Sequence, residues 1–322
     1  MNDALLQLSG VVVDLVFRAP RPPARGEDVL ASAFAPAVGG GFNAMAAARR
    51  EGLRVVYGGG LGTGPFADRV AAALAAEGIE ALQPRQAEEQ GVCVVIVDDT
   101  GERSFVSKEG ADGVLSPAAL APLRGARWGG VIVSGYPLIH ARSAAALTAW
   151  LRKAEGARLF FDPTPAHGRM APKAMAAALH RAAWVSANAA EAAEILGRDA
   201  PGEALASDLL ARMGPSAEGA VVRLGPEGCA LATRDGALRV PGFPAEAVDT
   251  NGAGDAHLGV FAAGLIRGLA PEGAARRANA AAALAVARPG PATAPRGAET
   301  DAALAAQGHA PDGRARGAAT GR

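Results

Sequence analysis

Short apolar runs rich in β-branched residues alternate with alanine-rich stretches of helical length, and this alternation constrains the fold more than any other feature of the chain. The apolar runs stand at residues 11–13, 55–57, 131–134, 159–162, 184–186 and 220–223. Strands separated by helices at this spacing form βαβ units, which build a mainly parallel sheet with helices on both faces. We therefore expect an α/β fold.

Two segments break the alternation. Residues 14–38 contain four prolines, and residues 90–111 carry two strand-like runs on either side of a turn at 98–101. The second segment is typical of a β-hairpin, and the two together predict a small β-sheet that projects as a lid over a ligand. We expect one α/β domain over residues 1–308, followed by a disordered Gly/Ala/Arg-rich tail at 309–322.

Charge and cysteine content exclude several classes of protein. The 322 residues include 32 Lys+Arg and 32 Asp+Glu, so no excess of positive charge favours a nucleic acid or an anionic membrane as partner. Cys93 and Cys229 are too few for a disulfide framework or a cysteine-based metal site. The N-terminus has no basic targeting region and no apolar run is long enough to cross a bilayer, so we expect a cytoplasmic protein.

The strongest local motif is Asp-Thr-Asn-Gly-Ala-Gly-Asp at residues 249–255, followed by an apolar helical run. The small residues Gly252, Ala253 and Gly254 let the backbone approach a ligand, with N–H groups at a helix start available to an anion. Asp255 then stands where a carboxylate can accept the proton of an attacking hydroxyl. The alternative is that Asp255 caps the helix and the glycines form a tight turn.

A second glycine cluster precedes a helical stretch near the N-terminus. Gly39, Gly40 and Gly41 allow close backbone contact with a polar ligand, and Asn43 can both donate and accept hydrogen bonds to hydroxyls. The alternative is a plain strand-to-helix turn. The chain has no dinucleotide fingerprint and no P-loop motif, which removes the best evidence for a Rossmann dehydrogenase or a P-loop kinase.

Together the two motifs resemble the signature regions of the ribokinase-like (PfkB-type) carbohydrate kinases. The resemblance spans about residues 5–300, and Asp14, the Asn-Ala-Ala-Glu run at 188–191 and Gly225 follow in the family's order. It implies a ribokinase-like fold with a small β-sheet lid. It also implies that Asp255 is the catalytic base and that the 252–254 backbone is the anion hole.

The resemblance also implies binding roles. The acceptor is expected to be bound by Asp14, Gly39, Gly40, Gly41 and Asn43. The nucleotide side is expected to include Asn188, Glu191, Arg223, Gly225, Gly228, Thr250 and Asn279. Asn188 and Glu191 are expected to organise Mg²⁺ through water and phosphate, whereas alone they are typical of a helix cap followed by an exposed acid. A monovalent cation, K⁺, is expected near Asp249.

The predicted activity is ATP- and Mg²⁺-dependent transfer of the γ-phosphoryl group to a primary hydroxyl of a small sugar. A nucleoside kinase of the same fold is an alternative, since Phe17, Phe34, Phe42 or Phe105 can supply a face for a base. A non-catalytic sugar or nucleotide sensor is the alternative from another class. The residues do not identify the acceptor.

The predicted lid hairpin carries two cations and strand-like apolar positions. Arg103 and Lys108 can reach an anionic or hydroxyl-rich substrate, although exposed charges are common in hairpins. An exposed lid sheet has an apolar face to cover, and pairing two lids across a two-fold axis covers it. The sequence therefore predicts a homodimer through the lid.

Overall fold

The computed structural model describes residues 4–123, 128–153 and 156–312. Its strands are β1 (Ala4–Gln7), β2 (Val11–Arg18), β3 (Ala33–Gly40), β4 (Arg54–Tyr57), β5 (Glu80–Ala81), β6 (Val92–Val97), β7 (Arg103–Lys108), β8 (Gly130–Ser134), β9 (Arg158–Asp162), β10 (Trp184–Asn188), β11 (Gly219–Arg223), β12 (Gly228–Thr233) and β13 (Gly236–Pro241). Its α-helices are α1 (Gly41–Arg50), α2 (Pro65–Ala76), α3 (Pro117–Leu120), α4 (Ala144–Leu151), α5 (Pro172–Arg181), α6 (Ala189–Leu196), α7 (Gly202–Ala211), α8 (Ala253–Ile266), α9 (Pro271–Val286) and α10 (Gly297–Ala306). Short 3₁₀ turns lie at Ala111–Gly113, Ala121–Leu123, Tyr136–Leu138, Pro165–Arg169 and Gly225–Glu227.

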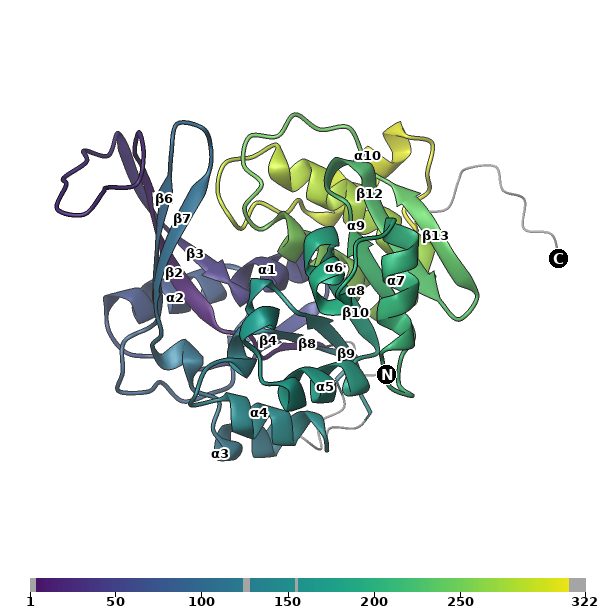
Figure 1. Cartoon of the computed structure of the whole chain (residues 1–322), viewed down its shortest axis with the longest axis horizontal. Coiled ribbons are helices and arrows are strands. Elements are labelled where there is room, and N and C mark those ends of the chain that lie inside the picture. The colour runs from purple at the N-terminus through teal and green to yellow at the C-terminus, as the bar shows by residue number, and fades with distance from the viewer. Residues whose placement is uncertain (1–3, 124–127, 154–155, 313–322) are drawn as a thin grey trace.

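A large sheet forms the centre of the molecule (Figure 1). Within the described residues its strand order is β13-β12-β11-β10-β9-β8-β1-β4-β5. The pairs from β11 to β5 are parallel, and β12 and β13 add an antiparallel edge. The expected α/β fold with a mainly parallel sheet is confirmed.

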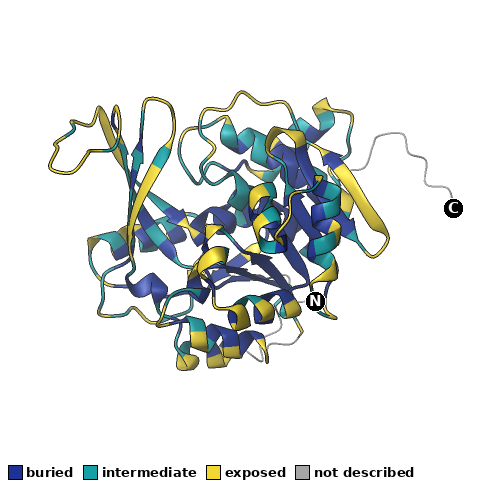
Figure 2. Cartoon of the chain, in the orientation of Figure 1, coloured by how far each residue is buried: buried dark blue, intermediate teal, exposed yellow. Residues whose placement is uncertain are grey.

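Helices cover both faces of this sheet because its strand residues alternate between two cores. Leu5 belongs to one core, which contains residues of α1, α8 and α9. Leu6 belongs to the other, which contains residues of α4, α5, α6 and α7. Figure 2 shows the large sheet as the most buried layer and the outer strands and loops as exposed. The strands buried on both faces explain the continuous apolar runs seen in the sequence.

The second sheet has the order β3-β2-β6-β7 within the described residues, and we call it the lid sheet. It confirms the predicted small sheet and stands apart from the large sheet (Figure 1). One expectation was wrong: residues 11–13 belong to β2 of the lid sheet, and the large sheet begins instead with the short buried strand β1. Asp14 therefore lies within β2, paired with Cys93 of β6, and does not follow a strand of the large sheet.

Buried polar side chains attach the base of the lid sheet to the rest of the chain. The Oδ1 atom of Asp112 accepts hydrogen bonds from the N–H groups of Gly91 at 2.8 Å and Gly110 at 3.1 Å, just outside the two ends of the β6–β7 hairpin. The Nε2 atom of Gln90 donates to the carbonyl of Val11 at 2.6 Å. These hydrogen bonds fix the positions at which β2 and the β6–β7 hairpin join the main domain.

The C-terminal helices are tied to the core by a buried arginine. Arg277 donates to Glu51 at 2.6 Å, to Asp301 at 2.5 Å and to the carbonyl of Pro311 at 2.8 Å. The start of the expected tail, up to Pro311, therefore contacts the folded domain, while residues 313–322 lie outside the described residues. Among the described helices, none combines the length and apolarity needed to cross a bilayer.

Candidate active site

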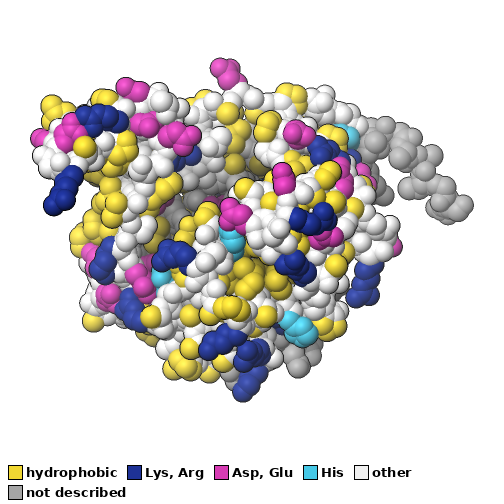
Figure 3. Space-filling model, viewed as in Figure 1, with side chains coloured by type: hydrophobic (Ala, Val, Ile, Leu, Met, Phe, Trp, Pro, Cys, Tyr) yellow, Lys and Arg dark blue, Asp and Glu magenta, His cyan; other side chains and the backbone are white. Residues whose placement is uncertain are grey.

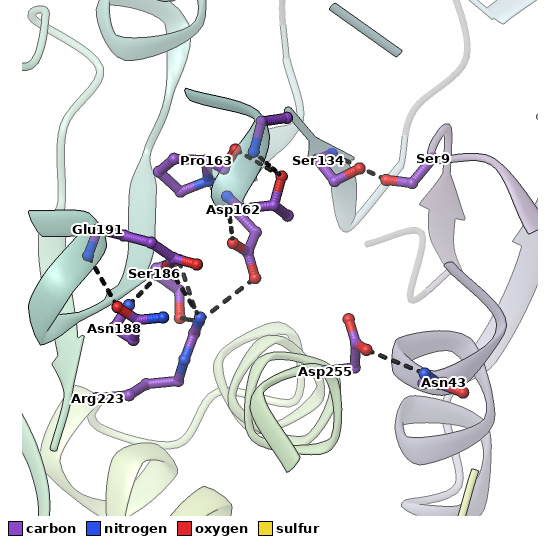
Figure 4. Close-up of polar contacts among 12 residues, drawn as sticks. Ser9, Asn43, Ser134, Asp162, Pro163, Ser186, Asn188, Glu191, Arg223 and Asp255 are labelled. Atoms are coloured by element: carbon purple, nitrogen blue, oxygen red, sulfur yellow. Dashed lines mark hydrogen bonds and ion pairs between the residues drawn. The ribbon is translucent and has the colours of Figure 1, made fainter. Parts of the chain in front are cut away.

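Polar and charged side chains gather where the parallel strands of the large sheet end, facing the start of α8 (Figure 4). Asp162 ends β9, Asn188 ends β10 and Arg223 ends β11. Asp255 lies in the first turn of α8. Ligands of open parallel sheets bind at this end of the strands. Figure 3 shows a hollow between the lid sheet and the main domain.

Asp255 is held in place by Asn43 of α1. The Nδ2 atom of Asn43 donates to Oδ2 of Asp255 at 3.0 Å, while the buried Oδ1 of Asn43 has no hydrogen-bond partner among the described residues. Burial raises the pKa of Asp255 to about 7; the Asn43 bond and Arg223 oppose this shift, and Asp162 and Asp14 add to it. A carboxylate with this pKa is well suited to accept a proton near neutral pH.

The start of α8 has the features of an anion cradle. Gly252 precedes the helix with φ 77°, and a Cβ there would lie 2.1 Å from the carbonyl of Pro291, so the position requires glycine. The helix has no side-chain cap; the N–H of Ala253 donates to the carbonyl of Thr250 at 3.3 Å, and the N–H of Gly254 in the same turn is left to a ligand. A Cβ on Gly254 would lie 3.3 Å from Nε of Arg223, so a guanidinium stands beside the same turn.

Arg223 links two acids that face this turn. Its Nη1 atom donates to Oγ of Ser186 at 2.7 Å and lies 3.4 Å from Oδ2 of Asp162, and its Nη2 atom lies 3.5 Å from Oε2 of Glu191. Asp162 was not predicted as a site residue. The signal was present, because this acid ends the apolar strand Leu-Phe-Phe at 159–161 and therefore reaches the ligand end of the sheet.

Asn188 and Glu191 form a capping box at the start of α6. Asn188 Oδ1 accepts from the N–H of Glu191, and Glu191 Oε2 accepts from the N–H of Asn188, both at 2.8 Å. Glu191 is only 6% exposed, so it is not the exposed acid of the helix-cap alternative. Burial, followed by the charge of Asp162, raises its pKa.

The side chains of Asp162, Asn188 and Glu191 suit a magnesium ion that keeps its waters, and not a metal ion bound directly by several side chains. Among the described residues, no three His, Cys, Asp or Glu side chains are placed to hold a metal ion. The carboxylates of Asp162 and Glu191 and the amide of Asn188 are oxygen donors of the kind that Mg²⁺ contacts while it keeps waters and phosphate oxygens. The donor set fits that expectation, and the magnesium role of Asn188 and Glu191 stays a prediction.

The predicted acceptor residues lie where β3 leads into α1. A Cβ on Gly39 would lie 2.2 Å from Oδ2 of Asp14, so the glycine makes room for this carboxylate. Gly40 has φ 64°, and a Cβ on Gly41 would lie 3.0 Å from the carbonyl of Ser9. Burial raises the pKa of Asp14 to about 6. The structure thus brings Asp14 and the glycine cluster to the lid side of Asp255.

The predicted nucleotide residues after β11 form a tight turn. Gly225 and Gly228 have φ 60° and 95°, and a Cβ on Gly228 would lie 2.2 Å from the carbonyl of Val240. Asn279 is buried, and its Nδ2 atom donates to the carbonyls of Val240 and Pro241 at 3.0 Å each. Its Oδ1 atom is 3.1 Å from Nε2 of His257. A direct contact of Asn279 with a nucleotide would break these bonds.

Arg103 of the lid sheet contacts the opening residues of the 249–255 motif. Its guanidinium pairs with Oδ1 of Asp249, and Nη1 donates to Oγ1 of Thr250 at 3.3 Å. Asp249 Oδ1 also accepts the N–H of Asn251 at 2.9 Å, and its Oδ2 accepts the N–H of Gly290 at 3.1 Å. Both oxygens accept hydrogen bonds, and the monovalent-cation role of Asp249 stays a prediction.

The large parallel sheet, with a lid sheet beside it and the start of α8 facing the strand ends, is the ribokinase-like fold, and solved structures share it. Arabidopsis thaliana ribokinase complexed with ribose and ATP matches with a TM-score of 0.75 and 23% identity, covering 94% of this chain and 99% of that one. Burkholderia thailandensis nucleoside kinase in complex with inosine matches with a TM-score of 0.77 and 20% identity, covering 97% and 99%.

Sequence comparison gives the family. The profile described as pfkB family carbohydrate kinase matches residues 7–296, and the chain belongs to this family. An uncharacterized sugar kinase of Escherichia coli (strain K12), YegV, is 29% identical over 269 residues, covering 83% of this chain and 84% of that protein. The predicted family membership and the assignment as a carbohydrate kinase are confirmed.

Proposed function

We propose that this kinase transfers the γ-phosphoryl group of ATP to a primary hydroxyl of a small sugar, with Asp255 as general base. The observation that carries the proposal is the Asp255 carboxyl, held by Asn43 in the first turn of α8 with a pKa raised to about 7. A base within an anion cradle serves the attack of a hydroxyl on a phosphoryl group.

Each part of the site has a role in this reaction. Asp14 and the free Oδ1 of Asn43 bind acceptor hydroxyls and direct one of them toward Asp255. Asp255 takes the proton of that hydroxyl as it attacks. The N–H groups of residues 252–254 and the guanidinium of Arg223 stabilise the negative charge on the transferred group. The lid sheet excludes water, which competes with the acceptor hydroxyl.

The nucleotide side follows from the same arrangement. Magnesium, when bound, neutralises phosphate charge, and Asn188 and Glu191 would hold it through water, with Asp162 beside them. The residues that we propose for direct contact with the nucleotide are Arg223, Gly225, Gly228 and Thr250. Asn279 is proposed to act on this side through the carbonyls of Val240 and Pro241, to which it donates. Arg223 is the best supported of these, because its guanidinium lies beside Gly254 at the cradle.

A nucleoside is the second candidate acceptor. One row across three strands of the lid sheet is formed by Val16, Val95 and Phe105. Val16 is two residues after Asp14 in β2, so this row lies on the same face of the sheet as Asp14. This row is an apolar surface beside a carboxylate that can bind ribose hydroxyls. The solved nucleoside kinase with inosine shows that the fold accommodates such an acceptor in that protein.

A phosphorylation screen with ATP and Mg²⁺ tests the proposal. Pentoses, hexoses, sugar acids and nucleosides are offered one at a time, and ADP release and the phosphorylated product are measured. We expect transfer to one sugar or nucleoside class well above ATP hydrolysis without acceptor. ATP binding without transfer to any class would contradict the proposal and favour a sensor.

A further inference from the structure

We propose that Arg103 is a latch that fastens the lid sheet to the loop preceding the anion cradle, so that lid closure and cradle geometry are coupled. The coupling to an anion cradle rests on the proposed function, whereas the contact between Arg103 and the loop does not depend on it. It makes Arg103 a positioning residue, because its contacts are with Asp249 and Thr250 of the motif.

Arg103 stands on the acceptor-facing side of the lid. It pairs with Val97 across β6 and β7, and Ser107, four residues along the strand, pairs with Cys93. Cys93 pairs with Asp14 in turn, so all these side chains share one face of the sheet. Movement of the strand that carries Arg103 therefore moves the face that carries Asp14.

Asp249 joins the other side of the latch to the cradle. It accepts the N–H of Asn251, one residue before Gly252, and the N–H of Gly290 beyond α9. The side chains of Arg103 and Asp249 are 24% and 15% exposed. A pair so sheltered from solvent is screened less than an exposed surface pair, and loss of Arg103 leaves a poorly hydrated carboxylate without its partner.

The latch also supplies the positive charge at Asp249. Oδ1 accepts from Arg103 and from Asn251, so the guanidinium already supplies a positive charge to the carboxylate at which the family resemblance suggests a monovalent cation. The guanidinium takes the place of that cation at this side chain. The charge at Asp249 then depends on the position of the lid and not on the salt in solution.

Hydrogen exchange of the ligand-free protein tests the latch. The variant is Arg103→Met, with Arg103→Lys to restore the charge and Arg18→Met as the matched control. Arg18 is exposed and pairs with Val97 in the same row of the lid sheet. We expect amides of both 103–108 and 249–254 to exchange about three- to tenfold faster in Arg103→Met. We expect partial recovery in Arg103→Lys and no change in Arg18→Met.

Faster exchange confined to residues 103–108, or an equal effect in Arg18→Met, would overturn the latch. A second arm adds the non-hydrolysable analogue AMP-PNP with Mg²⁺, with its binding measured by calorimetry. We expect AMP-PNP to slow exchange at 92–106 in the wild type and to lose most of this effect in Arg103→Met. Equal lid protection in both proteins would overturn the coupling. Failure of AMP-PNP to bind would contradict the proposed function, while the ligand-free comparison still decides the latch.

Thermal unfolding tests the charge assignment. Potassium replaces tetramethylammonium at constant ionic strength, and we expect the wild-type Tm to change by less than about 1 °C. We expect Arg103→Met to gain stability with potassium, because Asp249 then lacks its cation. A rise of several degrees in the wild type would overturn the assignment of that charge to Arg103.

Discussion

Asp255 has a carboxyl group whose surroundings shift its protonation toward the range in which a base is most useful. Burial raises its pKa to about 7 although Asn43 donates to it and Arg223 lies nearby. The effect of burial on this pKa is therefore larger than the opposing effects of the Asn43 hydrogen bond and the Arg223 charge, which both favour the ionised carboxylate. An acid that only caps a helix has no need of this environment, which favours the catalytic interpretation of the motif over the capping one.

The pH dependence of turnover follows from this pKa. Asp255 acts only when ionised, so kcat is expected to rise about tenfold per pH unit below about 7 and to level off above it. The measurement is kcat between pH 5 and 9 at saturating ATP and acceptor. Turnover that is flat from pH 5 to 7, with chemistry shown to be rate-limiting, would contradict the assignment.

Gly254 offers a second test at the scale of single residues. A valine there places a side chain against Arg223, since even a Cβ would lie 3.3 Å from its Nε atom. We expect Gly254→Val to lower kcat by about 10²-fold or more with a small loss of stability. Gly168→Val is the matched control, because a Cβ there meets nothing within 4 Å. Full activity of Gly254→Val would show that this turn does not bind the phosphoryl group.

The sequence predicted which residues form the site only where those residues are neighbours in the chain. The roles of Asp255 and the nearby glycines were predicted from a local motif, and the structure places them in one turn. The pairing of Arg103 with Asp249 was not predicted, because it joins residues 146 positions apart through the fold. Asp162 was not predicted although its position at the end of an apolar strand was visible in the sequence, because its contact with Arg223 joins residues 61 positions apart.

At the scale of elements, the lid sheet shows where local patterns suffice. The alternation around a turn predicted the β6–β7 hairpin, which the structure confirms. The parallel pairing of β2 with β6 was not predicted, because it depends on the anchoring of both segments by Asp112 and Gln90. These side chains are polar and buried, and no periodicity marks them.

The position of Asp14 in the lid sheet predicts a selective effect on the acceptor. Asp14→Ala removes a partly buried carboxylate that we propose to bind acceptor hydroxyls, so the acceptor KM is expected to rise about 10- to 100-fold. The KM for ATP is expected to change less than about threefold. Asp28→Ala, an exposed acid of the same lid segment, is the control. Equal changes in both KM values would move Asp14 away from the acceptor.

At the scale of the whole molecule, the outer part of the lid sheet leaves apolar side chains in solvent. Phe34 is 55% exposed and Val106 is 69% exposed, and Phe17 packs against Phe34 with ring centroids 4.8 Å apart. Apolar patches of this kind favour association. The homodimer through the lid remains a prediction that rests on this surface.

Sedimentation velocity tests the dimer. We expect the wild type to sediment as a dimer at micromolar concentration and Val106→Asp to sediment as a monomer. Ser104→Asp, on the same edge strand, is the control for added charge, with a smaller expected effect because it buries little apolar area. A wild type that remains a monomer across the concentration range would contradict the dimer and leave the kinase assignment untouched.

The central claim is that Asp255 is the general base, and single-turnover phosphoryl transfer by Asp255→Asn tests it most directly. The substitution keeps the shape of the side chain and removes its basicity. We expect the rate to fall about 10²- to 10⁴-fold while AMP-PNP still binds. Folding raises the pKa of Asp255 to about 7, so ionisation of this buried carboxyl lowers the stability of the wild type as the pH rises from about 4 to 7, and the full cost remains above pH 7. Asparagine does not ionise, so we expect the variant to be at least as stable as the wild type at pH 8. A rate within about threefold of the wild type, measured on folded variant that binds AMP-PNP, would contradict the account.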